Sequence, residues 1–157
     1  MTDVEKTEIR PAVSTDAEEI AAVHLASRAV GMPFLPPQER VWGEVVWWIE
    51  NVVLAECRVW VAVRGAETVG FAALDGDVLD QLYLRPDVRR QGVGTLLLEE
   101  VGRHSPEGLS LRVFEQNTGA RAFYARHGFT VLDTDDGSRT MEKLPGMTLR
   151  RVPGTAV

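Results

Sequence analysis

The residues with the clearest chemical potential form a glycine-rich stretch, Arg89-Arg90-Gln91-Gly92-Val93-Gly94-Thr95, between an expected strand and an expected helix. Its two glycines let backbone N–H groups approach an anion closely, and the helix that follows directs the positive end of its dipole at the same point. With Arg85 and two further arginines against Asp87, the stretch is locally basic although the chain carries a net charge of −6. We therefore predict that it binds phosphate groups.

Two common nucleotide-binding patterns do not fit this stretch. The dinucleotide fingerprint requires a third glycine, but Leu97 holds that position and the strand is not the first of a βαβ repeat. The Walker pattern requires Gly-Lys followed by Ser or Thr, and this stretch lacks it. Taken alone, the glycines also fit an ordinary turn between a strand and a helix.

A second group of residues falls on one face of a helix that we predict over Asn117–His127. Asn117, Ala120 and Tyr124 are spaced i, i+3 and i+7, which places them in one row. The small Ala120 between two polar side chains leaves a groove. The alternative interpretation of Tyr124 is a tyrosine at the edge of the core, whose hydroxyl would need some partner.

Together the two groups resemble motifs A and B of the GNAT (Gcn5-related) N-acetyltransferases. The motif A signature, Gln/Arg-x-x-Gly-x-Gly/Ala, appears as Arg89–Gly94. Motif B appears in Leu111–Phe129, where Asn117 is followed by Ala after three residues, by Phe-Tyr after six and seven, and by Gly-Phe where the helix ends. The resemblance covers Val78–Phe129, and the chain is identified as a member of this family.

The resemblance implies that acetyl-CoA is the cofactor. In the family the pyrophosphate lies on the motif A loop, the pantetheine arm pairs with strand backbone, and the thioester lies between two splayed strands. The Asn commonly bonds the cofactor arm and the Tyr commonly protonates the departing thiolate, so these roles fall to Asn117 and Tyr124. The implied cofactor-binding residues are Leu82, Tyr83, Leu84, Arg89, Arg90, Gln91, Gly92, Val93, Gly94, Thr95, Asn117, Ala120 and Phe123.

The reaction that the resemblance implies is direct attack of a primary amine on the thioester. The protein has to position both reactants, bind the oxyanion and move two protons. Asp80 is the candidate base, because family members often place an acid or a water-binding group on this strand, where Asp80 is expected to share a face with Val78, Leu82 and Leu84. A solvated strand charge is an equally simple interpretation of Asp80, and Val78 stands where some members have an acid.

The acceptor pocket is expected in the proline-bounded loop that holds Met32, Phe34 and Leu35. No acid occurs between Glu19 and Glu39, so we expect an amine on an apolar body rather than a polyamine. A small metabolite or drug amine, a lysine side chain and a protein amino terminus all remain open. A noncatalytic acyl-CoA sensor or scaffold protein of the same fold is the alternative function.

The elements that position these residues follow from periodicity and turn signals. We predict an α/β fold of α+β type, with a mixed, mainly antiparallel sheet and a central parallel pair. Thr15 and Glu18 have the spacing of a capping box, which would start a first helix that the residues Gly31–Pro37 break. The other expected elements are a strand over Glu8–Val13, a helix from Trp42 that stops near Asn51, strands near Cys57–Val63, Thr68–Leu74 and Val78–Leu84, a helix over Gly92–Arg103, and strands over Leu109–Phe114, Phe129–Leu132 and Met147–Val152.

Length and composition limit the classes of protein that remain. The 157 residues, 45% apolar and 25% charged, predict one domain over 1–157. The single Cys57 and three scattered histidines predict no metal site, and the net negative charge disfavours a nucleic-acid partner. No charge-free run approaches the length of a membrane span, and the amino terminus lacks a secretory signal, so we expect a cytoplasmic protein. A homodimer is left open.

Overall fold

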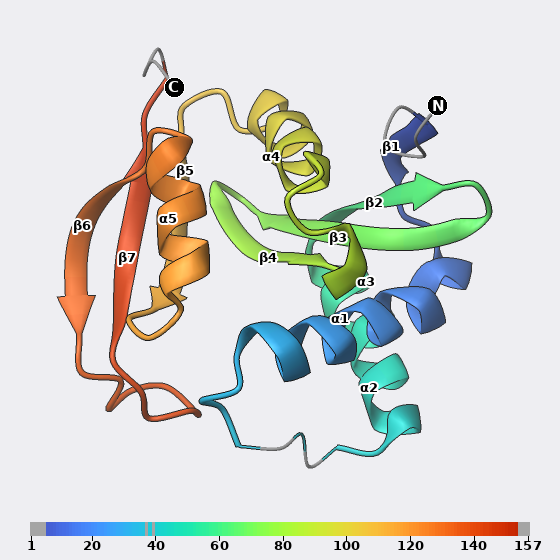
Figure 1. Ribbon diagram of the computed structural model, residues 1–157, viewed down its shortest axis with the longest axis horizontal. Coiled ribbons are helices and arrows are strands. Elements are labelled where there is room, and N and C mark those ends of the chain that lie inside the picture. Colours follow the sequence, from blue (N-terminus) through green and yellow to red (C-terminus); the bar gives the residue numbers. More distant parts are fainter. Residues whose placement is uncertain (1–5, 37, 39, 154–157) are drawn as a thin grey trace.

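A single sheet organises the part of the chain that the computed structural model describes, residues 6–36, 38 and 40–153. Its strands are β1 (Thr7–Pro11), β2 (Arg58–Arg64), β3 (Glu67–Asp75), β4 (Val78–Leu84), β5 (Leu109–Phe114), β6 (Thr130–Asp135) and β7 (Gly146–Arg151). They lie in the order β1-β2-β3-β4-β5-β7-β6, as Figure 1 shows. Every neighbouring pair is antiparallel except β4 and β5. The predicted mixed sheet with a central parallel pair is confirmed.

Helices cover both faces of the sheet. They are α1 (Ala17–Gly31), α2 (Trp42–Trp48), α3 (Leu54–Glu56), α4 (Val93–Arg103) and α5 (Thr118–Arg126), with short helical turns at Ser14–Asp16, Ile49–Val53 and Pro86–Val88. In Figure 1, α4 lies on one side of β2, β3 and β4, and α1 and α2 lie on the other. None of the helices within the described residues is both long and apolar enough to cross a membrane.

The alternation of side chains along the strands divides the core into two clusters. Trp60 and Ala62 of β2 face the side of α4, where Leu97 and Leu98 are fully buried. Val59 and Val61 face the opposite side, in a second cluster that contains residues of α1 and α2. Each face of the sheet is thus fixed by burial, which also fixes the strand register.

The parallel pair in the centre of the sheet is short. In the described residues β4 and β5 are paired only at Val78 and Ser110, and beyond this point the strands separate. The carboxyl-terminal half of β4, from Gln81 to Leu84, therefore keeps its pairing with β3 but has no partner strand on its other side. Backbone groups at this edge are free to bind another extended chain.

The start of α1 differs from the prediction. Neither Thr15 nor Glu18 forms the expected capping box; instead, the carboxylate of Asp16 accepts a hydrogen bond from the backbone N–H of Val13 at 2.8 Å. The same carboxylate accepts two hydrogen bonds from Arg10, each 2.9 Å. Asp16 is buried, so its charge needs this partner, and the ion pair determines where the helix starts.

The second helical segment is longer than predicted. It continues past Asn51 as a π-helical turn, Ile49–Val53, and ends with α3 at Glu56. Val45, Ile49 and Val53 are buried at intervals of four residues, which suits a segment wound more loosely than an α-helix. Trp42, the first residue of α2, has helical spacing to these residues in the sequence, but it lies off the buried stripe and is 48% exposed.

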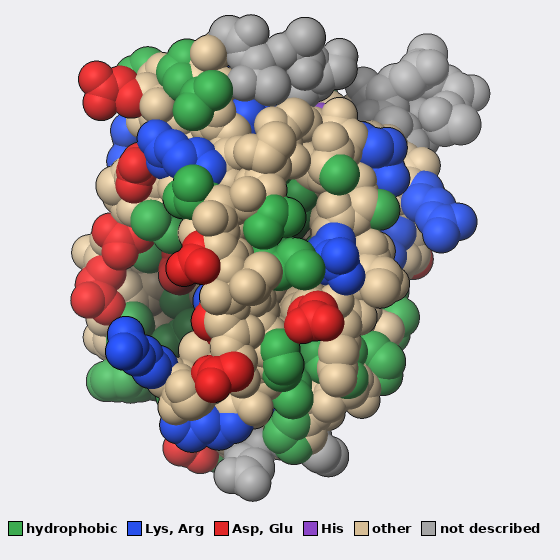
Figure 2. Space-filling view, turned by 90° about the vertical axis from the view of Figure 1, so that its left-hand side faces the viewer, with side chains coloured by type: hydrophobic (Ala, Val, Ile, Leu, Met, Phe, Trp, Pro, Cys, Tyr) green, Lys and Arg blue, Asp and Glu red, His purple; other side chains and the backbone are tan. Residues whose placement is uncertain are grey.

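The strand β6 forms one edge of the sheet, next to β7. All six residues of β6 are exposed, including Val131 and Leu132, and the acidic residues Asp133 and Asp135 follow them. Figure 2 shows this side of the molecule, with hydrophobic and acidic side chains intermixed over the surface. Charged residues on an exposed edge strand disfavour pairing with a further strand. The predicted closing strands at Phe129–Leu132 and Met147–Val152 are confirmed with bounds shifted by a few residues.

Candidate active site

The predicted phosphate-binding loop forms the amino-terminal end of α4. Gly92 precedes the helix with φ of +84°, a left-handed conformation that side chains disfavour, and Arg90 also has a positive φ of 63°. Gly94 follows in the first turn, where an added Cβ would meet the ring of Phe123 at 3.3 Å. One glycine thus sets the turn, and the other lets α4 and α5 pack closely. This geometry presents backbone N–H groups to an anion.

A cavity of about 780 Å³ opens between this loop, the end of α1, the free edge of β4 and the first turns of α5. It brings together most of the residues that the sequence singled out. Of these, its lining includes Met32, Phe34, Leu82, Tyr83, Leu84, Arg89, Arg90, Gly92, Gly94, Thr95, Asn117, Ala120, Phe123 and Tyr124. Residues that lie far apart in the chain thus share one site.

The structure does not bring three of the predicted binding residues to the cavity wall. Val93 is fully buried in the core cluster on the α4 side, so only its backbone can face a ligand. The side chain of Gln91 donates a hydrogen bond to the backbone carbonyl of Asp87 at 3.3 Å. Leu35 lies just beyond the part of the loop that lines the cavity.

Asp80 also lies outside the cavity lining. The pairing of β3 with β4 shifts by one residue here: Ala73 pairs with Gln81 and Leu74 pairs with Leu79, which leaves Asp80 in a bulge. The bulge interrupts the strand face that Val78, Asp80 and Leu82 were expected to share. Leu79 and Leu82, three residues apart, both pack against the core on the α4 side, so that expectation is wrong. Asp80 is exposed, and its carboxylate accepts a hydrogen bond from the Gln81 side chain at 3.1 Å. Its catalytic role stays a prediction.

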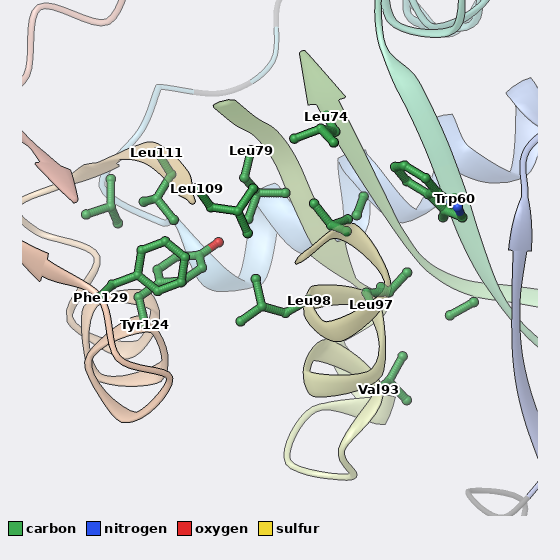
Figure 3. Close-up of a cluster of buried hydrophobic side chains, with 14 of the residues drawn as sticks. Trp60, Leu74, Leu79, Val93, Leu97, Leu98, Leu109, Leu111, Tyr124 and Phe129 are labelled. Atoms are coloured by element: carbon green, nitrogen blue, oxygen red, sulfur yellow. The ribbon is translucent and has the colours of Figure 1, made fainter. Parts of the chain in front are cut away.

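Tyr124 lies where α5 faces the core. Its side chain is buried, with only 8% exposed, and its ring packs against the rings of Phe123 and Phe129 at centroid distances of 5.2 and 5.3 Å. Figure 3 shows the hydroxyl directed away from Phe129. Burial raises the pKa of Tyr124 above its usual range, and nearby Tyr83 adds to the effect. The phenol therefore stays protonated at neutral pH and can act only as a proton donor there.

Asn117 begins α5 as its N-cap. Its side-chain oxygen accepts a hydrogen bond from the backbone N–H of Ala120 at 3.2 Å, so the amide group is held in place. The sequence predicted Asn117 and Ala120 on one helix face. The hydrogen bond of the cap also requires this spacing of three residues, because it joins the side chain of Asn117 to the backbone N–H of Ala120. The side-chain NH₂ of Asn117 is left to donate toward the cavity.

The amino-terminal side of the cavity has an apolar wall. Met32 is buried, and the ring of Phe34 makes an edge-on contact with Phe114 of β5, with centroids 5.7 Å apart. Two wall residues from the last turns of α1, Ser27 and Val30, were missed by sequence reasoning. Ser27 continues the buried stripe of α1, and the helical spacing in the sequence indicates this. The spacing does not indicate that the sheet opens beside the end of α1, which is what makes this helix end a wall of the cavity.

The cavity lining contains cationic side chains and no carboxylate within the residues that the structure describes. Arg89, Arg90 and Arg126 line it, and the guanidinium of Arg89 packs beside Gly31 at the end of α1. His127, which the sequence did not single out, shares a 3.2 Å hydrogen bond with Thr95 and links α5 to α4. The site is thus positive in a chain of net negative charge, as an anionic ligand requires.

Comparisons with known proteins agree with this geometry. Residues 55–131 match the profile of a family described as an acetyltransferase (GNAT) domain. Two similar relatives are peptidyl-lysine N-acetyltransferases named YjaB. The one from Escherichia coli is 36% identical over 127 residues, which cover 78% of this chain and 82% of the relative. The one from Salmonella typhimurium is 47% identical over 79 residues, so the match spans 50% of this chain and about half of that relative.

Solved structures show the same fold. The solution structure of apo-form YjaB from Escherichia coli matches with a TM-score of 0.76 and 32% identity, covering 94% of this chain and 99% of the other. An N-acetyltransferase of Thermoplasma acidophilum, solved in complex with coenzyme A, matches with a TM-score of 0.72, covering 93% and 98% of the two chains. At 20% identity, this second likeness concerns the fold alone.

Proposed function

Because the chain belongs to the GNAT acetyltransferase family and is thus an acetyl-CoA-dependent N-acetyltransferase, we propose that its acceptor is the side-chain amine of a lysine in a peptide or protein. The observation that carries this proposal is the similarity to YjaB, a peptidyl-lysine N-acetyltransferase that this chain matches over 82% of its length. Another relative with this description, YiaC from Escherichia coli, is 28% identical over 126 residues.

The residues of the cavity fit acetyl-CoA, which supplies the acetyl thioester when bound. The glycine turn at Gly92 and the first N–H groups of α4 suit the phosphates, and Arg89 and Arg90 add positive charge beside them. The unpaired edge of β4 at Leu82–Leu84 suits a chain with amide groups. Asn117 can donate to the same arm through its side-chain NH₂.

The apolar wall suits a lysine side chain. Its four methylene groups can lie against Met32 and Phe34 while the amine reaches the thioester, as lysine stems commonly do on apolar surfaces. The described lining offers no carboxylate to hold a second or third cation, which disfavours a polyamine. Within this reaction Tyr124 donates its phenolic proton to the departing thiolate, and the amine attacks directly.

Release of the free thiol tests the acceptor. The purified protein would be mixed with acetyl-CoA and one of three acceptors: a peptide with an internal lysine and a blocked amino terminus, the same peptide with arginine at that position, and a small alkylamine. We expect thiol release and a gain of one acetyl group with the lysine peptide alone. Turnover of the small amine without the lysine peptide would replace the proposed acceptor by a metabolite and leave the family assignment intact.

A further inference from the structure

His127 and Thr95 both line the cavity, and a hydrogen bond joins their side chains. The Nε2 atom of His127, directly after α5, lies 3.2 Å from the hydroxyl oxygen of Thr95 in the first turn of α4. The imidazole also packs on the ring of Phe123, with centroids 4.6 Å apart, and that ring lies close to Gly94. The imidazole is therefore held beside the glycine turn.

Thr95 occupies the part of α4 that is best suited to an anion. The first hydrogen bond of this helix runs from the N–H of Leu96 to the carbonyl of Gly92 at 3.1 Å. The N–H groups of the three residues before Leu96 have no carbonyl within the helix to accept from them. Thr95 can therefore offer a backbone N–H and a hydroxyl to the same ligand. Among the residues that the structure describes, His127 is the single hydrogen-bond partner of this hydroxyl.

The direction of this hydrogen bond depends on the protonation state of the imidazole. A neutral His127 can carry its proton on Nδ1, in which case the Thr95 hydroxyl donates to Nε2 and has no hydrogen left for a ligand. A cationic His127 carries protons on both ring nitrogens, so Nε2 donates and the hydroxyl hydrogen is free to point at a ligand. The same proton adds a positive charge to the site. Both effects strengthen the binding of an anion.

The charged groups around His127 come from three elements and are mostly positive. Burial lowers the pKa of His127, and the guanidinium groups of Arg151 on β7 and Arg126 on α5 lower it further, whereas Glu99 on α4 raises it. Arg151 also donates a hydrogen bond to the backbone carbonyl of His127 at 3.2 Å. The negative charges of a bound pyrophosphate would offset these arginines, because an opposite charge nearby favours the cationic form of a histidine.

We propose that His127 is a positioning residue that turns the Thr95 hydroxyl toward the pyrophosphate of coenzyme A, and that it takes up one proton when this ligand binds. The proton comes from solvent and forms an N–H bond on the ring nitrogen that carries none, and no other bond forms or breaks. Because the cationic form binds the anion more tightly, the affinity should decrease as the pH rises, by at most about tenfold per pH unit for one proton. The inference rests on the phosphates lying at the glycine turn and is independent of the acceptor.

Calorimetric titration with dephospho-coenzyme A tests the inference without any acceptor. This ligand keeps the pyrophosphate but lacks the phosphomonoester of coenzyme A, which itself titrates at about pH 6 and would obscure the proton of His127. For the wild type we expect the affinity to fall by about tenfold in total between about pH 5.5 and 8. Titrations in two buffers of different ionisation enthalpy should show net uptake of protons on binding.

Three substitutions separate the proton from the hydrogen bond. His127→Gln keeps an amide that can donate to the Thr95 hydroxyl but does not titrate, so its affinity should stay close to that of the wild type at about pH 8 and should not change with pH. His127→Phe keeps a ring against Phe123 and loses the donor, so its affinity should be at least about threefold lower than that of His127→Gln. In a Thr95→Val background, which lacks the hydroxyl, His127→Phe should have little further effect at about pH 8.

His104→Phe is the matched control, because His104 is also half-buried and hydrogen-bonded, to Arg58 at 2.9 Å, but lies outside the cavity lining. It should keep the affinity and the pH dependence of the wild type. The inference is overturned if the wild-type affinity is constant with pH, if the pH dependence persists in His127→Gln, or if the glutamine and phenylalanine variants bind equally well. A wild type that binds the ligand at no pH would overturn it together with the assignment of the loop. A wrong acceptor class does not affect the result, because no acceptor takes part.

Discussion

The two tyrosines beside the cavity differ in what their surroundings allow. Tyr124 comes from α5 and has its ring among Phe123 and Phe129, whereas Tyr83 comes from β4 and packs edge-on against His24. Burial raises the pKa of both, that of Tyr83 to about 12. Both phenols therefore keep their protons at neutral pH, and the position of each hydroxyl decides which proton transfer it can serve.

Replacing Tyr124 with phenylalanine removes one hydroxyl and leaves the ring packing in place. If Tyr124 protonates the thiolate, turnover should fall by roughly 10² to 10⁴ while acetyl-CoA affinity persists. Steady-state thiol release and calorimetric titration would measure the two quantities. Wild-type turnover in Tyr124→Phe would remove the residue from the mechanism, and a parallel loss of binding would make it a packing residue.

His24 should also make stability depend on pH. Burial, followed by the charges of Arg28 and Arg40, lowers its pKa from 6.5 to about 4 in the folded chain. Between these values the unfolded chain binds a proton that the folded chain does not, so the free energy of unfolding should fall as pH drops from about 6.5 to 4. The loss should be on the order of 2–3 kcal/mol.

Urea unfolding of the wild type and His24→Phe across this range would measure the effect. His127, whose pKa is also lowered by burial, contributes in the same direction, so the comparison concerns the difference between the two curves. Above pH 4, the free energy of unfolding of His24→Phe should depend less steeply on pH than that of the wild type, because the contribution of His24 is gone. Below that value both proteins should still weaken, because Asp16 has a lowered pKa through Arg10. Parallel curves above pH 4 would show that His24 titrates normally.

At the scale of elements, local signals predicted the secondary structure around the site well. The glycines before α4 and after α5, the helical spacing in both and the turn signals that separate β2, β3 and β4 depend on neighbours within a few residues, and these elements agree with the structure. Three features could not be predicted. The bulge at Asp80, the π turn at Ile49–Val53 and the Arg10–Asp16 cap depend on which distant residues each element meets. The cavity wall from α1 was missed for the same reason.

The turn before α4 gives a prediction for the phosphate-binding loop. Gly92→Ala places a side chain at φ of +84°, which costs roughly 1–2 kcal/mol and should turn the N–H groups away from an anion. We expect the rise in melting temperature caused by coenzyme A to disappear. Gly43→Ala is the matched control, because Gly43 lies in α2, has open space around it and should keep the shift. An unchanged shift in Gly92→Ala would contradict the assignment of the loop.

The loop after α1 gives a prediction for the acceptor side. Phe34→Ala removes the ring that contacts Phe114 and lines the cavity. Burial of such a ring against an acceptor is worth roughly 1–3 kcal/mol, so the KM for the acceptor should rise while that for acetyl-CoA stays constant. Steady-state kinetics with both substrates would measure this. A change confined to melting temperature would show that Phe34 is a core residue, and the acceptor would then have to be recognised by the lining residues of α1 and β4.

At the scale of the whole molecule, the single pairing of Val78 with Ser110 divides the sheet into two parts that share little backbone. β1 to β4 carry one part, and β5, β7 and β6 carry the other, with α5 beside them in Figure 1. The amide hydrogens of Leu82 and Leu84 then have no strand to protect them on the side of β5. A pantetheine arm bound along this edge would take the place of the missing neighbouring strand and accept hydrogen bonds from these amides. Hydrogen–deuterium exchange at these amides should therefore slow when coenzyme A binds, and the two parts of the sheet should open less independently of each other.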